Sequence, residues 1–278
     1  MNLEGKKRLV SFGCSFTSGA ELIDHEILGI SFDDCNKMKR QWTADKKVIT
    51  EFEQAVAREG NMTLEEYVNA CSKRSYAAKL ADKLDLEHVN YAIPGSATDH
   101  MVLDLFRGHY TEKLNSTTDL LLIGMTMPHR YLCFSPEKMG IPVSRVLSER
   151  DFIPSDSHYN DYKVMQTYLF ALQNFKNFCI VNNYDFYMQP ILPKELLFYT
   201  DPKSKHGNIF PDMHVNWQYL LTFNKLFQEL LDFSIDANVS LFDRSNECGV
   251  VCGFIHPPEK AHMFFAEALY DKIINTKN

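Results

Sequence analysis

The sequence predicts an α/β protein in which a mostly parallel sheet of about five strands is covered by helices on both faces. Short apolar runs recur along the chain, and segments whose apolar residues have helical spacing lie between them. The clearest run, at 119–125, is almost entirely aliphatic and shows no alternation. Such a run is typical of a strand buried on both faces, and strands that alternate with helices are typical of a parallel sheet.

Each element is predicted from its local pattern. Strands are expected at 8–13, 88–92, 119–125, 184–189 and 238–242. Helices are expected at 75–84, 98–108, 161–182, 215–232 and 259–275. Prolines interrupt the segments 131–158 and 193–214, so both are expected to be loops.

The segment 20–70 differs from the rest of the chain, because charged residues are frequent there and helical patterns, near 48–58 and 63–71, are weak. We interpret it as an insertion of helices and loops rather than a second domain with its own core. With another insertion at about 131–160, the chain 1–278 is expected to form a single α/β domain. A chain of this length can bury roughly three-quarters of its unfolded surface, so it requires no disulfide or metal for stability.

Composition and charge exclude several classes of protein. Hydrophobic residues make up 45% of the chain and aromatic residues 13%, which argues against disorder. The net charge of −7 disfavours a nucleic-acid partner and attraction to an anionic membrane. No apolar window approaches the roughly 18 residues of a membrane span, and the N-terminus lacks a signal-peptide pattern. Seven cysteines without a framework spacing indicate reduced thiols, so we expect a cytoplasmic protein.

Ligands of parallel sheets bind beyond the carboxyl ends of the strands. This rule directs attention to the segments that follow the first three predicted strands, and to one more segment before the last helix. These candidate site loops are 13–19, 93–98, 124–130 and 252–258.

The first loop offers Ser15 as a candidate nucleophile. It follows the first strand near the start of a helix, where unpaired N–H groups and the helix dipole favour developing negative charge. A serine becomes nucleophilic only when a base takes its proton. Taken alone, Ser15 is better explained as a helix cap, because capping serines are common. Cys14 is a rival nucleophile, but a tight turn should direct its side chain into the core.

The second and third loops offer groups that can stabilise or hold an anion. Gly95 allows the backbone to approach a ligand and to present its N–H, although a simple turn after a proline is the common alternative. Thr126 can donate its hydroxyl to an oxyanion. Arg130 can hold a carboxylate or phosphate, but a structural ion pair is slightly favoured. His129 is expected at the surface or in packing.

The fourth loop contains the best candidate for a general base, His256. An imidazole titrates near neutral pH, although a lone histidine is also explained by a structural hydrogen bond. Pro257 and Pro258 suit the first turn of the helix that follows. His262 lies within that helix and is expected to pack there.

Four segments together resemble the conserved blocks of the SGNH/GDSL hydrolase superfamily. VSFGCSFT at 10–17 is similar to the first block, a strand that ends in G-x-S, and NYAIPG at 90–95 is similar to N-x-A-x-x-G. LIGMT at 122–126 stands where G-x-N-D belongs, and His256-Pro257 resembles the block with the catalytic histidine. The blocks occur in the family's order. The residues of these blocks are most similar to those of SGNH proteins from tailed bacteriophages.

The resemblance implies a three-layer α/β/α sandwich with a flavodoxin-like sheet, and the chemistry of a serine esterase without cofactor or metal. Ser15 would be the nucleophile and His256 the general base. The Ser15 N–H, the Gly95 N–H and the Thr126 hydroxyl would form the oxyanion hole, and Arg130 would be a substrate contact. The implied substrate is a small acyl ester or an acylated carbohydrate. A phage origin would place the protein in a host-cell cytoplasm or on a virion.

Two positions depart from the family pattern. Thr126 stands where the family has an asparagine, and Gly253 stands where it has the triad aspartate, three residues before the histidine. The acid normally orients the histidine and stabilises its charged form. A backbone carbonyl near 252–253 or another acid would have to replace it. The acids considered are Asp243, Glu247 and Glu259.

Three alternatives follow from these residues. A catalytically degenerate binding or structural protein, virion-associated in a phage, is consistent with both departures. A metal protein is disfavoured, because the C-x3-C-x3-H-x5-H spacing of Cys248, Cys252, His256 and His262 is not a standard zinc pattern. A nucleotide-binding protein is disfavoured because neither G-x-x-x-x-G-K-[ST] nor G-x-G-x-x-G occurs.

Overall fold

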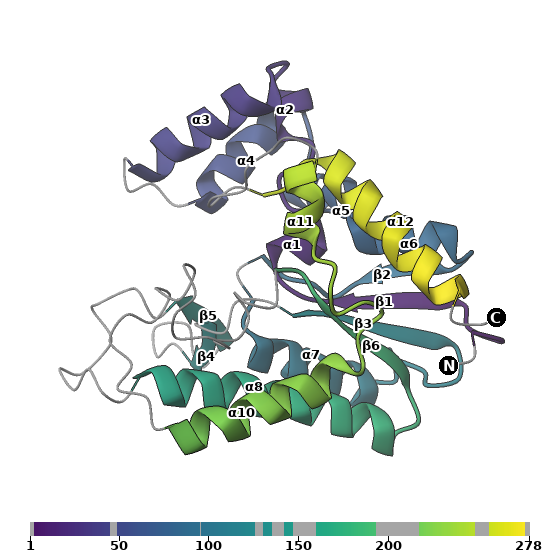
Figure 1. Cartoon of the computed structure of the whole chain (residues 1–278). Helices are drawn as coiled ribbons and strands as arrows, with labels where there is room; N and C mark the ends of the chain where they lie inside the picture. Colours follow the sequence, from purple (N-terminus) through teal and green to yellow (C-terminus); the bar gives the residue numbers. More distant parts are fainter. Residues whose placement is uncertain are drawn as a thin grey trace.

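The computed structural model describes residues 3–44, 49–94, 96–125, 130–134, 142–146, 160–192, 217–247 and 256–275. Within these ranges four strands form one parallel sheet in the order β2-β1-β3-β6 (Figure 1). The strands are β1 (Arg8–Phe12), β2 (Glu87–Asn90), β3 (Asp119–Met125) and β6 (Asp185–Pro190). They coincide with the first four predicted strands, and the order is that of a flavodoxin-like doubly wound sheet.

The centre of this sheet is apolar because it is covered on both sides. All seven residues of β3 are buried. In β1, Leu9, Val10 and Phe12 are fully buried, and Val10 lies in register with Val89 of β2 and Leu121 of β3. Burial of each large aliphatic side chain contributes roughly 1.5–3 kcal/mol, so this two-sided core stabilises the sheet strongly.

Helices cover both faces of the sheet (Figure 1). The helices of one face are α6 (Tyr76–Lys83) and α12 (Glu259–Asn275), which pack on each other. The helices of the other face are α7 (Thr98–Tyr110), α8 (Asn160–Val181) and α10 (Trp217–Leu231). These five helices confirm the helical predictions and the three-layer α/β fold. Over the described residues, no helix combines the length and apolar character that crossing a membrane requires.

The fifth predicted strand, at 238–242, is wrong. The chain instead begins helix α11 (Leu241–Glu247) there. Ser240 Oγ accepts a hydrogen bond from the Asp243 N–H at 3.1 Å, and the Asp243 carboxylate accepts from the N–H and hydroxyl of Ser240 at 3.0 and 2.6 Å. These reciprocal capping bonds start a helix, and they outweigh the β preference of a very short apolar run.

The prediction of a loop over 131–158 is wrong in part. Strands β4 (Arg130–Phe134) and β5 (Pro142–Val146) form a separate antiparallel pair. Pro142 is the first residue of β5, where a proline is tolerated in a strand. β4 contacts α7 and α8, and the pair lies near the carboxyl ends of the main sheet (Figure 1).

The segment after β1 is a group of helices, as predicted. It contains α2 (Asp24–Ile27), α3 (Phe32–Ala44), α4 (Ile49–Glu59) and α5 (Leu64–Ser72). The last two coincide with the two helical patterns. The segment also encloses a small apolar cluster separate from the main core, formed by Ile23, Phe52, Val56, Ala57, Tyr67 and Cys71. We call residues 20–72 the helical insertion; α2, α3 and α4 lie beyond the carboxyl ends of the strands (Figure 1).

Candidate active site

The topology places Ser15 at the switch point of the sheet. The chain leaves β1 for β2 on one side, whereas β3 lies on the other side of β1. In doubly wound sheets, ligands bind outside the carboxyl ends of the two strands at which the order reverses. β1 ends at Phe12, three residues before Ser15, and β3 ends at Met125. Ser15 therefore occupies the position where this fold class binds its ligands.

The structure does not support a capping role for Ser15. Helix α1 (Ser15–Ser18) is a single turn whose N-cap residue is Cys14, and no side chain caps it. The N–H groups of Thr17 and Ser18 both donate to the Cys14 carbonyl at 3.0 Å. The Cys14 side chain is fully buried in the main core, as the sequence predicts. Ser15 thus has no capping function that would explain its presence.

The turn that carries Ser15 is packed tightly on β3. A Cβ atom at Gly13 would lie 2.1 Å from Thr17 Oγ1, and one at Gly124 would lie 2.2 Å from the same atom. Thr17 Oγ1 and the Tyr76 hydroxyl lie 3.4 Å apart. A side chain at either glycine would occupy the space of Thr17, so the two glycines allow the turn to pack against the end of the sheet.

His256 lies beside this turn. Its ring centroid is 4.8 Å from that of Phe16, the residue after Ser15. His256 Nδ1 is 2.8 Å from Glu21 Oε2, and since a carboxylate only accepts, Nδ1 carries the proton of this bond. His256 Nε2 is buried, and among the described residues it has no hydrogen-bond partner. The hydrogen bond from Ser15 to His256 is therefore not formed in this structure.

Glu21 is held in an uncommon conformation. Gly19, which caps the C-terminus of α1, has a φ of 72°, and Glu21 itself has a φ of 70°. Left-handed backbone is uncommon for residues other than glycine. The Glu21 carboxylate is buried and also forms a 2.8 Å ion pair with Lys39 of α3. Burial alone would raise the pKa of Glu21, but the charges and hydrogen bonds of His256 and Lys39 outweigh it and lower the pKa to about 2.

A network of charged groups connects Glu21 to other residues of the helical insertion. Lys39 Nζ also lies 2.8 Å from Asp24 Oδ2, and the Tyr67 hydroxyl donates to Asp24 Oδ1 at 2.5 Å. Burial raises the pKa of Asp24, against the effect of Lys39. Burial and the carboxylates of Glu21 and Asp24 raise the pKa of Glu53 to about 7. Lys39 is therefore the cation around which these buried acids are arranged.

The acids considered from the sequence have other partners. Asp243 caps α11, Glu247 pairs with Arg244 at 2.6 Å, and Glu259 pairs with Arg74 and Lys79 at 3.2 and 3.3 Å. Residues 252 and 253 lie outside the described residues.

Glu21 was missed by the sequence reasoning, although the sequence contains a signal for it. Between positions 9 and 24, Glu21 and Asp24 are the only charged residues in a stretch of apolar and small side chains, and this whole stretch is buried. Buried acids are almost always paired. Two acids in such a stretch therefore point to buried cationic partners, which the structure shows to be His256 and Lys39.

Several predicted site residues cannot be placed. Gly95, Thr126 and His129 lie outside the described residues, so the proposed oxyanion donors other than Ser15 remain predictions. Arg130 is the first residue of β4, but the structure does not describe its side chain. The roles assigned to these residues are therefore not tested.

His262 lies within α12 and is buried, as the sequence predicts. Its Nδ1 accepts a hydrogen bond from the N–H of Tyr76, the first residue of α6, at 3.0 Å. Burial, with a smaller effect of the His256 charge, lowers the pKa of His262 to about 3, so the ring is neutral. In the described part of the chain, no three His, Cys, Asp or Glu side chains are arranged to hold a metal ion. Cys248 and Cys252 are outside it.

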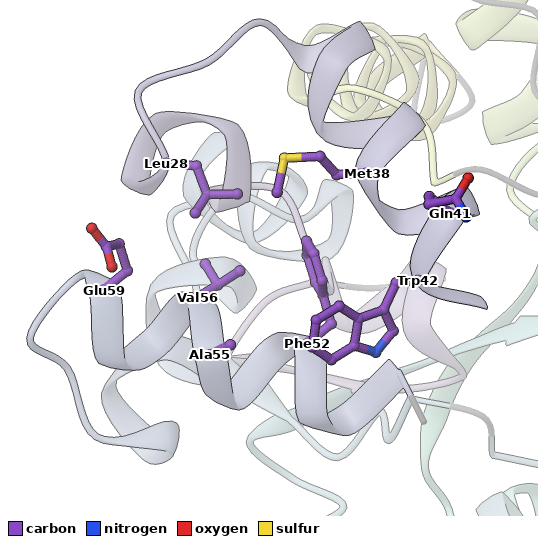
Figure 2. A pocket seen from close by; sticks show the side chains of 8 residues that line it. All are labelled: Leu28, Met38, Gln41, Trp42, Phe52, Ala55, Val56 and Glu59. Atoms are coloured by element: carbon purple, nitrogen blue, oxygen red, sulfur yellow. The ribbon is translucent and has the colours of Figure 1, made fainter. Parts of the chain in front are cut away.

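An open apolar pocket of about 320 Å³ lies within the helical insertion (Figure 2). Its lining residues are Leu28, Met38, Gln41, Trp42, Phe52, Ala55, Val56 and Glu59. The ring of Phe52 lines the pocket and lies 5.7 Å from Lys39 Nζ. Neither Ser15 nor His256 lines it, so this pocket is distinct from the candidate active site.

Comparison with known proteins finds similarity among solved structures only. No protein-family model and no curated protein matches the chain. The chain is similar to the solved structure of a protein from Desulfitobacterium hafniense DCB-2 that is assigned to the lipolytic G-D-S-L family. The sequence identity is 11%, the TM-score is 0.42, and the match covers 97% of this chain and 99% of that chain. With so low an identity and TM-score, no residue role can be carried over from that protein to this chain. The roles proposed for Ser15 and His256 rest on contacts within this chain.

Proposed function

We propose that this protein is a serine ester hydrolase in which Ser15 is the nucleophile and His256 the general base. One observation carries the proposal. His256 is held through Nδ1 by a buried carboxylate, while its Nε2 is buried and without a partner among the described residues, beside the turn that begins with Ser15. A serine without a capping role at the switch point supplies the matching nucleophile.

The bond to Glu21 sets the tautomer that catalysis requires. Because the carboxylate accepts the Nδ1 proton, the lone pair of the neutral ring resides on Nε2. Nε2 can then accept the proton of a serine hydroxyl. The contact between Ser15 and His256 forms only when substrate binds, since catalytic hydrogen bonds are often long in unliganded structures.

The reaction proceeds through an acyl-enzyme. Ser15 Oγ attacks the ester carbonyl carbon as its proton passes to His256 Nε2. The tetrahedral intermediate collapses, the bond to the alcohol oxygen breaks, and the alcohol takes the proton from Nε2. Water then attacks the acyl carbon as its proton passes to His256 Nε2, the bond to Ser15 Oγ breaks, and Oγ takes the proton from Nε2 as the acid is released. The Ser15 N–H, Gly95 N–H and Thr126 hydroxyl are the proposed oxyanion donors, each worth roughly 3–4 kcal/mol of the barrier.

The proposed substrate is a small acyl ester, with an O-acetyl group on a carbohydrate as the class that the SGNH resemblance favours. The helical insertion and the β4–β5 pair lie near the carboxyl ends of the sheet and can form walls around the substrate (Figure 1). Arg130 begins β4 and is the proposed substrate contact. A second candidate function, a non-catalytic binding module, is favoured by the open Ser15–His256 contact.

Ester hydrolysis distinguishes the two candidates. We would measure turnover of p-nitrophenyl acetate, butyrate and octanoate by the wild type, Ser15→Ala and the matched control Cys14→Ala, with circular dichroism to show that each is folded. The hydrolase proposal predicts turnover that falls with acyl length. Ser15→Ala should lose about 10³-fold or more in kcat, whereas Cys14→Ala retains activity. Full activity in Ser15→Ala would contradict the proposal, and a wild type inactive on all three esters would favour the binding module.

A further inference from the structure

We propose that Glu21 is the positioning acid of His256, in place of the acid absent at Gly253, and that Lys39 of helix α3 holds Glu21 for this role. The helical insertion would then be a working part of the active site and not only a wall beside it. This inference rests on the proposed function of Ser15 and His256.

The first argument is the geometry of the contact. Glu21 Oε2 accepts from His256 Nδ1 at 2.8 Å, and both side chains are mostly buried. Among the described residues, Glu21 is the acid whose carboxylate bonds to this ring. A buried carboxylate on Nδ1 orients the ring and stabilises its charged form during proton transfer. Glu21 therefore does what the triad acid does, from the opposite end of the chain.

The second argument is the way the backbone presents Glu21. A Cβ at Gly19 would lie 2.6 Å from the Cys71 carbonyl, so α1 ends in close contact with the end of α5. Two residues later Glu21 itself has a φ of 70°. Such backbone is uncommon for a residue other than glycine and persists only where the surrounding structure enforces it. In this conformation the Glu21 carboxylate contacts both His256 and Lys39.

The third argument is the position of Lys39. Its ammonium group lies 2.8 Å from both Glu21 Oε2 and Asp24 Oδ2, so it bridges two buried carboxylates. Without it, Glu21 would face Asp24 and Glu53 as like charges, with His256 as its remaining cationic neighbour. Among the described residues, Glu53 and His262 also interact electrostatically with His256, and His262 stays neutral. Lys39 thus keeps Glu21 ionised and fixed in orientation.

Nitrogen-15 NMR of the histidine rings tests the contact without a substrate. The His256 signals are assigned with His256→Asn. The proposal predicts an Nδ1–H tautomer in the wild type at high pH, and loss of its dominance in Glu21→Gln. The exposed Glu65→Gln on α5 is the matched control and should show the wild-type tautomer. An unchanged His256 tautomer in a folded Glu21→Gln would overturn the proposal, whether or not the protein hydrolyses esters.

The proposed role of Lys39 is tested separately, by measuring the pKa of Glu21. In Lys39→Met the pKa of Glu21, followed by its carboxyl carbon-13 signal, should rise from its lowered value of about 2. The reason is that the Lys39 ammonium group no longer stabilises the ionised carboxylate. Lys37→Met, on the exposed side of the same helix, should leave it unchanged. An equal Glu21 pKa in the two variants would show that Lys39 does not support Glu21. Lys39→Arg retains the positive charge, so the pKa of Glu21 should stay lowered in this variant. It is the variant to measure if Lys39→Met does not fold.

Kinetics then connect the contact to the proposed function. Glu21→Gln should lower kcat by about 10²–10⁴-fold, with KM unchanged because Glu21 contacts His256 and not the substrate. Glu21→Asp, which keeps the carboxylate, should recover part of this loss. If Ser15→Ala is inactive but Glu21→Gln is fully active, the hydrolase proposal stands and the role of Glu21 is refuted.

Discussion

Oε2 of Glu21 lies 2.8 Å from Nδ1 of His256, although 235 positions separate the two residues in the chain. The contact joins the start of the helical insertion to the start of the last helix, α12. Both segments meet beside the turn that carries Ser15, because Phe16 contacts the His256 ring. The proposed nucleophile and the proposed base, from the two ends of the chain, thus lie near the switch point of one sheet.

Acidification below pH 6.5 should destabilise the protein. Burial lowers the pKa of His88 to about 4 and, with a smaller effect of the His256 charge, that of His262 to about 3. Below pH 6.5 these two histidines therefore bind more protons in the unfolded chain than in the folded chain. Through them, the free energy of unfolding decreases as the pH is lowered. Glu21 acts in the same direction between pH 4.5 and about 2, because its carboxylate becomes protonated there. Glu53, with a pKa raised to about 7, opposes the two histidines between pH 7 and 4.5 and offsets part of their effect.

Urea unfolding at fixed ionic strength measures this effect. The free energy of unfolding should fall from pH 6.5 to 5. His262→Gln, which retains a polar side chain but does not titrate, should show a smaller fall over this range. An equal fall in the wild type and in folded His262→Gln would show that the His262 ring is not held neutral.

Gly13→Ala should destabilise the fold. The new Cβ would lie 2.1 Å from Thr17 Oγ1 and 2.4 Å from Thr17 Cβ, so either the turn or β1 must move. Overpacking of this kind costs typically 1–3 kcal/mol. Thermal or urea unfolding measures the loss. Gly60→Ala, where the nearest atom is 3.2 Å away, is the control and should cost less. Equal stability of the two variants would contradict the packing described for this turn.

Asp119 should matter for stability but not for chemistry. Its buried carboxylate accepts from Arg8 Nε at 2.7 Å, from the Asn115 N–H at 2.7 Å and from the Thr118 hydroxyl at 3.1 Å. Asp119→Ala leaves these donors without their acceptor and should cost about 3 kcal/mol. Because Asp119 begins β3, at the end of the strand away from Ser15, esterase activity of the folded variant should be unchanged. A selective loss of kcat would show that the two ends of the sheet are coupled.

The fold could be predicted largely because its signals are local. β3 is a continuous aliphatic run, and α12 carries an unbroken helical pattern. The errors occurred where two local signals compete. At 238–242 a short apolar run suggested a strand, but the capping pair Ser240 and Asp243 begins a helix. Around 131–158 the prolines suggested a loop, but Pro142 occupies a strand end that tolerates it.

The candidate site could be predicted only in part, because its contacts are not local. Ser15 and His256 were identified from short blocks of sequence. Their relation to Glu21 depends on how the chain returns to the sheet after more than two hundred residues, and no pattern within one segment encodes it. The acids near His256 in sequence were considered for that reason, and each has a different structural partner.

Labelling with a fluorophosphonate probe, followed by mass spectrometry of the modified peptide, tests most directly whether Ser15 is an activated nucleophile. It requires no knowledge of the substrate. We predict one adduct on Ser15, absent in Ser15→Ala, formed more slowly in His256→Ala and Glu21→Gln, and unaffected in folded Asp119→Ala. The absence of an adduct on the folded wild type, or an adduct that persists in Ser15→Ala, would contradict the proposed serine chemistry.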